Sequence, residues 1–103
     1  MMEAEVVSMS RINVKAVRCE ALFVSALQPS EDPSAPRVRQ EIRRAVRDLG
    51  SLGCAARVAQ EFGDHPEAAI MRMRWARQAV EYAFDERARR VVRRNTRFSR
   101  YIP

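Results

Sequence analysis

Arginines are the side chains in this chain with the clearest capacity for chemistry, and nine of the 18 form two groups of interest. Three of them, Arg72, Arg74 and Arg77, lie close together in the stretch MRMRWARQAV. The second group lies near the end of the chain and comprises Arg89, Arg90, Arg93, Arg94, Arg97 and Arg100. A guanidinium donates hydrogen bonds in a fork that fits guanine O6 and N7 or a phosphate. We therefore expect these arginines to bind nucleic acid, Arg72 at a guanine and Arg74 at a neighbouring phosphate.

The same stretch also carries large apolar side chains at helical spacing. Met71, Trp75 and Tyr82 recur at i, i+4 and i+11, which places them on one stripe of a helix. Trp, Met and Tyr are enriched in the cores of protein interfaces. The stripe therefore indicates either a subunit or partner interface, or a part of the core that a helix over residues 14–27 covers.

Residue types that serve enzymes are sparse. The single histidine, His65, precedes a proline, as is typical of a turn residue, and Cys19 and Cys54 each lie among apolar residues, as is typical of buried free thiols. The sequence has no glycine-rich phosphate loop, no metal-spaced His/Cys cluster and no nucleophile elbow. We expect no enzymatic activity, no cofactor and no metal site.

Charge is distributed unevenly along the chain. The 19 basic residues are 18 arginines and one lysine, a skew that is also typical of a GC-rich genome. Residues 1–86 hold 12 basic and 13 acidic residues, a net of −1, and residues 87–103 hold seven arginines and no acid, a net of +7; together they give the overall +6. Phe98 and Tyr101 alternate with these arginines. We expect such a segment either to bind phosphates by counterion release and stack on bases without reading sequence, or to be a solvated extension that contacts no nucleic acid.

Hydrophobic periodicity predicts an all-helical domain. Helices are expected over residues 14–27, 34–49, 51–63 and from 65 onward, the last running as far as Arg94. Residues 1–13 show no sustained period and are assigned only as an N-terminal arm. The fold class is therefore a small all-α bundle of about four helices with a basic C-terminal extension.

Turn residues mark the expected helix ends. Ser34 and Asp64 are N-cap acceptors followed by a proline in the first turn. Gly50 and Gly63 stand where a helix ends with a residue that tolerates positive φ. Two helices separated by about two residues at Gly63 and Asp64 predict a helix-turn-helix over residues 52–80.

The segment VAQEFGDHPEAAIMRMRWARQAV resembles the helix-turn-helix of sigma-factor region 4 and of related response-regulator output domains. In that family an alanine on the first helix precedes a glycine at the turn by four residues, and here these are Ala59 and Gly63. Ala69 and Met73 match inward positions of the recognition helix, and residues 72–77 resemble its trailing basic run. The resemblance implies a DNA-binding output domain. The outward face carries Met71 and Trp75, where the family has small polar residues. This difference leaves open the possibility that the helix binds a protein partner instead of DNA.

The leading hypothesis is a small DNA-binding or transcription-associated regulatory protein, with a helix-turn-helix on the duplex and an arginine-rich extension on the phosphates. The alternative is a helical interaction module, either an adaptor to a sigma factor or RNA polymerase or a homo-oligomer, that uses the Met71, Trp75 and Tyr82 stripe. A third possibility is non-specific nucleic-acid binding by the extension alone. Exposed Arg72 and Arg74 with a buried Trp75 favour DNA, and an exposed Trp75 favours a protein partner.

No stretch is long and apolar enough to span a membrane, and the acidic N-terminus lacks the unbroken apolar run of a signal peptide. We therefore expect a cytoplasmic protein with no membrane partner.

Overall fold

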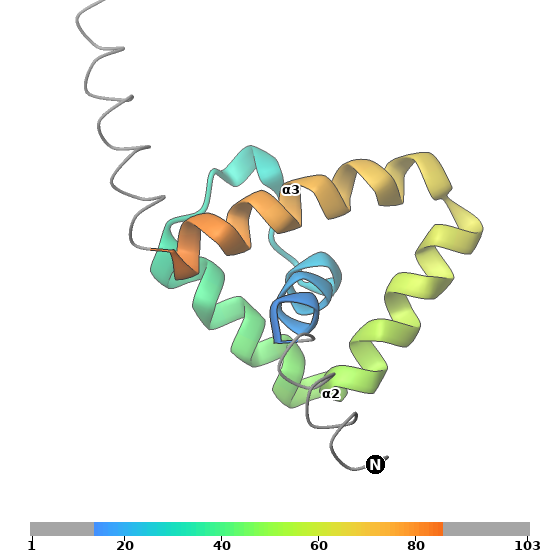
Figure 1. Ribbon diagram of the computed structural model, residues 1–103, viewed down its shortest axis with the longest axis horizontal. Coiled ribbons are helices and arrows are strands. Elements are labelled where there is room, and N and C mark those ends of the chain that lie inside the picture. Colours follow the sequence, from blue (N-terminus) through green and yellow to red (C-terminus); the bar gives the residue numbers. More distant parts are fainter. Residues whose placement is uncertain (1–13, 86–103) are drawn as a thin grey trace, which may run out of the picture.

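The computed structural model describes residues 14–85, and this part of the chain is helical with no strand. The chain forms a first helix over residues 14–24, a 3-10 helix η1 (Pro29–Glu31), helix α2 (Ala35–Asp64) and helix α3 (Pro66–Phe84). The two arms of the bent α2 and the whole of α3 make three sides of a triangle, and the first helix lies in its middle (Figure 1). The predicted all-α class is confirmed.

The first helix ends at Val24 rather than at Leu27, so its predicted C-terminus is wrong by three residues. The Ser25 hydroxyl donates to the Leu22 carbonyl at 2.6 Å and accepts the Leu27 N–H at 3.3 Å. A serine that bonds its neighbours' backbone in this way competes with the helical pattern. Leu27 nevertheless stays buried, because the chain turns back over the end of the helix.

Helix α2 begins as predicted and then bends. The Ser34 hydroxyl caps it by accepting the Arg37 N–H at 3.3 Å, and Pro36 lies in the first turn. Gly50 has φ 72° and ψ 166°, a combination that essentially only glycine adopts. The helices expected over 34–49 and 51–63 are therefore two arms of one bent helix. The predicted bundle of four separate helices is not confirmed.

The junction between α2 and α3 differs from the prediction. Gly63 and Asp64 lie in the last turn of α2, so neither the positive φ expected of Gly63 nor the N-cap role expected of Asp64 occurs. His65 alone separates the helices, with φ −140° and ψ 67°, and its N–H donates to the Glu61 carbonyl at 2.7 Å. The break falls at His65 because the residue before a proline is disfavoured in the helical region. The junction is shorter than the turn of three to four residues that is usual in a helix-turn-helix. The helix-turn-helix over residues 52–80 therefore stays a prediction.

Helix α3 ends at Phe84, before the predicted end at Arg94. Asp85 adopts an extended conformation (φ −114°, ψ 102°), and its N–H donates to the Glu81 carbonyl at 2.9 Å. The prediction of a continuous helix is therefore wrong at Asp85, and its remainder lies outside the described residues.

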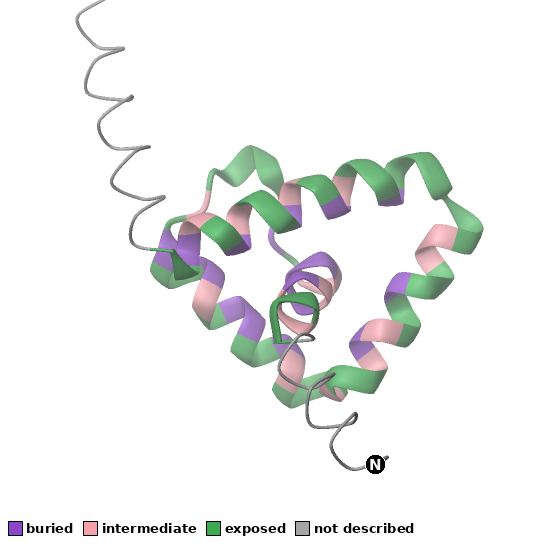
Figure 2. Ribbon diagram, viewed as in Figure 1, coloured by how far each residue is buried: buried purple, intermediate pink, exposed green. Residues whose placement is uncertain are grey.

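The core lies where all three sides of the triangle face the first helix (Figure 2). Leu22 of the first helix is fully buried, as are Val38 and Cys54 of α2 and Ala76 of α3. Hydrophobic periodicity predicts inward positions in α2 and α3. Most of them are buried, whereas Leu49 and Ala59 of the same periods are exposed; the buried ones are Val38, Ile42, Ala45, Val58, Ala69, Met73, Ala76 and Val80. Burial of apolar surface around the first helix is what holds the triangle together.

Candidate interaction surface on helix α3

The half-buried Arg72 side chain donates its hydrogen bonds to other parts of the fold. Its Nε donates to the Phe23 carbonyl at 2.6 Å, and its Nη2 donates to the carbonyls of Ser25 and Leu27 at 2.9 Å each. These carbonyls lie at the end of the first helix, where the backbone has no helical partner. Burial lowers the pKa of the Arg72 guanidinium. The expectation that Arg72 points outward to read a base is wrong, because its donors cap the first helix.

A second arginine, Arg39, also donates to a backbone carbonyl near the end of a helix, in this case α3. No pattern in the sequence predicted this hydrogen bond. Arg39 of α2 donates from Nη1 to the Ala83 carbonyl at 2.7 Å. Arg18 of the first helix places its guanidinium carbon 3.9 Å from the centre of the Phe84 ring. Several arginines thus hold helix ends together, which lowers the number available for an external ligand.

Arg74 and Arg77 are exposed on α3, as predicted. Arg77 lines a groove of about 530 Å³ between α3 and the first helix, together with Lys15, Glu20 and Glu81. Acidic and basic side chains therefore alternate on this side of α3. Over residues 14–85 eleven basic and ten acidic residues give a net charge of +1, which gives little electrostatic attraction for a polyanion.

The remaining predicted nucleic-acid contacts, Arg89, Arg90, Arg93, Arg94, Arg97 and Arg100, lie outside the described residues. The structure therefore does not place them relative to Arg74 and Arg77.

The predicted partner residues lie along one flank of α3. Trp75 and Tyr82 are half-buried and pack against the core, whereas Met71 is 70% exposed. The two rings also line an open groove of about 440 Å³, with Gln78 and Ala79 beside them on α3 and Asp32, Pro33 and Ser34 opposite. The rings of Trp75 and Tyr82 therefore pack against the core and also line a groove that is open to solvent. We call this feature the aromatic groove.

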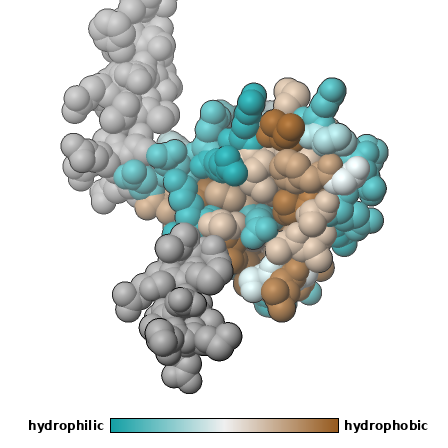
Figure 3. All heavy atoms as spheres, turned by 45° about the vertical axis from the view of Figure 1, so that its right-hand side comes forward, coloured by the Kyte–Doolittle hydropathy of each residue, from teal (hydrophilic) through white to brown (hydrophobic). Residues whose placement is uncertain are grey.

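The other exposed apolar side chains lie elsewhere. Leu52 follows the Gly50 bend and is 86% exposed, and Ile70 is 44% exposed next to Met71. Figure 3 shows apolar atoms gathered on the face where the second arm of α2 meets α3. Residue spacing did not mark Leu52 or Ile70 as exposed, because each also fits the apolar period of a helix.

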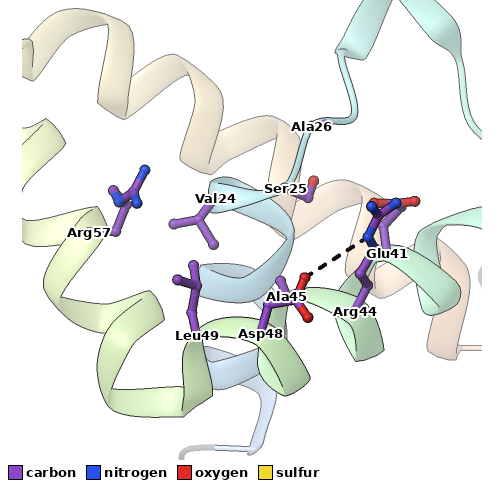
Figure 4. Close-up of a pocket in the computed structure, with 9 residues that line it drawn as sticks. All are labelled: Val24, Ser25, Ala26, Glu41, Arg44, Ala45, Asp48, Leu49 and Arg57. Atoms are coloured by element: carbon purple, nitrogen blue, oxygen red, sulfur yellow. Dashed lines mark ion pairs between the residues drawn. The ribbon is translucent and has the colours of Figure 1, made fainter.

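A further groove of about 340 Å³ lies between the end of the first helix and α2 (Figure 4). Its apolar lining includes Val24 and Leu49. Its acids are paired: Asp48 lies 4.0 Å from the Arg44 Nε, and Glu41, which is 8% exposed, lies 3.6 Å from the Arg37 Nε. Ion pairs of this kind, in which at least one partner is exposed, contribute little to stability.

Residues 14–85 contain no group of three or more His, Cys, Asp or Glu side chains that could hold a metal ion. None of the helices in this range is long and apolar enough to cross a membrane. Comparison of the chain with models of protein families, with curated proteins and with solved structures gave no match. Function is therefore inferred from the geometry of α3 and its surroundings.

Proposed function

We propose that the protein is a helical interaction module whose protein partner binds the flank of α3 marked by Met71, Trp75 and Tyr82. The aromatic groove carries this proposal, because it presents two aromatic rings to solvent on a rigid helix beside an exposed methionine. Trp and Tyr offer a large contact area at little cost in side-chain entropy. A transcription-associated adaptor, with a sigma factor or RNA polymerase as its partner, is consistent with this surface.

Two observations support a protein partner over a DNA groove at α3. The guanidinium of Arg72, the expected base reader, is held by backbone carbonyls of the first helix. The exposed surface of α3 also carries Glu67 and Glu81 near Arg74 and Arg77, so repulsion offsets much of the attraction to phosphates.

A second candidate function is nucleic-acid binding, and the charge distribution favours it. Residues 87–103 contain seven arginines and no acid. With Arg74 and Arg77 exposed on α3, a duplex contacted by both regions would fit the regulatory function implied by the resemblance to sigma-factor region 4. Binding of this kind weakens steeply with salt.

Site-specific photo-crosslinking tests the interaction module. A photoreactive phenylalanine analogue replaces Met71 in one variant and Gln60, an exposed residue of α2, in the control. We expect the Met71 variant to crosslink one discrete protein in cells and the Gln60 variant not to do so. Equal crosslinking by both variants, or none by either, would refute an interface on this flank of α3.

Fluorescence anisotropy with random-sequence duplex DNA at several salt concentrations tests the second candidate. The native chain is compared with an Arg74→Ala/Arg77→Ala variant and with a full-length variant whose seven arginines in 87–103 are glutamines. Loss of binding in both variants supports docking by two regions. Loss only in the second variant means that the extension alone grips phosphates. Absence of binding by the native chain at low salt eliminates this candidate.

A further inference from the structure

The aromatic groove has a chemical character that narrows the choice of partner. Among its lining residues only Asp32 carries a charge at neutral pH, and no lysine or arginine lines it. Asp32 makes no ion pair within the described part of the chain, and the exposed Glu31 lies next to it. Arg37 lines the neighbouring pocket with Asp32 but pairs with Glu41. The groove therefore combines aromatic rings with a carboxylate that forms no ion pair in residues 14–85, a combination that favours a cation over a polyanion.

One of the two rings of the aromatic groove, Trp75, already contacts a guanidinium within the fold. The Arg72 guanidinium carbon lies 5.0 Å from the centre of the Trp75 ring and 5.8 Å from that of Phe23, within the usual range of cation–π contacts. Arg72 does not line the aromatic groove; it lines a neighbouring pocket with Phe23 and Ala69. Trp75 thus lines the groove without a basic side chain of the groove's own lining beside it.

We propose that the aromatic groove binds an arginine-bearing segment of a partner protein. This inference rests on the proposed function, since it assigns a class of partner to the same surface. A guanidinium stacks on Trp75 or Tyr82, and the carboxylate of Asp32 pairs with it. Trp75 and Tyr82 are seven residues apart, about 10 Å along the helix axis. An extended segment of roughly three residues covers that distance, at about 3.3 Å per residue.

The test uses the full-length protein and a fluorescein-labelled peptide in which arginines alternate with serines. A matched peptide replaces each arginine with citrulline, which keeps the shape of the side chain and removes its charge. Peptide binding is followed by anisotropy, and the emission of Trp75, the single tryptophan of the chain, reports contact at the groove. We expect saturable binding of the arginine peptide and at least tenfold weaker binding of the citrulline peptide.

Three variants locate the site. Asp32→Asn removes the charge while retaining the left-handed backbone of residue 32 (φ 47°), which asparagine tolerates well; we expect about fivefold weaker binding. Trp75→Leu is expected to weaken binding further, and circular dichroism checks that this variant is folded. Asp64→Asn removes an exposed carboxylate at the far end of α3 and is expected to leave affinity unchanged. Equal effects of the Asp32 and Asp64 substitutions would overturn the proposal.

The chain's own arginines are controlled by the full-length variant with glutamines in 87–103. Binding of the peptide to this variant but not to the native chain would assign the groove to the chain's own segment and overturn a partner's arginines. No binding to either protein, or equal binding of the citrulline peptide, would also overturn it. If the Met71 crosslink forms while the arginine peptide fails, the interaction module stands and only the assignment of an arginine-bearing partner falls.

Discussion

Replacing Arg72 with methionine should destabilise the fold, because the guanidinium is the hydrogen-bond partner of several carbonyls at the end of the first helix. Nε and Nη2 make three bonds of 2.6 to 2.9 Å. Hydrogen bonds from charged groups contribute about 1.5–3 kcal/mol each, and a buried acceptor left unpaired costs about 1–3 kcal/mol. Arg72 is only half-buried, so water replaces part of this loss.

We therefore expect the Arg72→Met variant to lose about 2–4 kcal/mol of unfolding free energy, well below the sum of three separate bonds. In a domain of this size that loss lowers the melting temperature by roughly 10–25 °C. Urea unfolding followed by circular dichroism at 222 nm gives the free energy without relying on Trp75, whose fluorescence the substitution itself disturbs.

Arg74→Met is the matched control, since Arg74 lies two residues away on the same helix and is exposed. Its expected effect is within about 0.5 kcal/mol, as for most surface substitutions. Arg72→Lys should fall between the two, because an ammonium keeps the charge but cannot reach several carbonyls with a planar fork. If the Arg72 and Arg74 variants unfold at the same urea concentration, Arg72 does not cap the first helix.

Further substitutions and reagents test the local geometry. Gly50→Ala should lower the free energy of unfolding by about 1–3 kcal/mol, because Gly50 has a positive φ. Gly63→Ala should raise the free energy of unfolding by about 0.5–1 kcal/mol, because Gly63 lies inside α2 and an added Cβ meets nothing within 4 Å. Urea midpoints that shift in the same direction for both variants would contradict this assignment. Burial raises the pKa of the Cys19 and Cys54 thiols above 9.0, so an aromatic disulfide reagent should react slowly until the chain unfolds. Because the folded-state pKa of each thiol is raised, its contribution to the free energy of unfolding is fully present below the ordinary thiol pKa. That contribution is lost as the pH rises through the folded-state pKa. Ser34→Ala should cost about 1 kcal/mol in thermal unfolding, and no change would mean that its hydroxyl is not a cap.

Local signals predicted much of the secondary structure. The cap at Ser34 and the positive φ of Gly50 were predicted from residue type and spacing. Most of the inward face of α2 was also predicted, but Leu49 and Ala59 of the predicted face are exposed. The junction at His65 was misplaced because two signals competed there. Gly63 and Asp64 favour a helix end, but Pro66 restricts only the residue before it, and this restriction decided where the helix breaks.

The candidate site was only partly predictable. Sequence spacing placed Met71, Trp75 and Tyr82 on one stripe of a helix, and α3 is helical across all three residues, but only Trp75 and Tyr82 line the aromatic groove. Spacing could not indicate that Asp32 and Pro33 face the two rings, because that contact joins residues more than forty positions apart. Spacing also predicted wrongly that Arg72 points outward. The periodicity of α3 does not reveal that the first helix ends beside Arg72.

By itself, the sequence determined the all-helical class, most of the apolar faces, the positive φ of Gly50 and the concentration of positive charge in residues 87–103. These follow from composition and from interactions within one or two turns of a helix. Only the tertiary structure decided which arginines are used internally and where a carboxylate meets aromatic rings. Such choices depend on how the first helix, η1 and α2 pack around α3, and packing brings together residues that no local pattern relates.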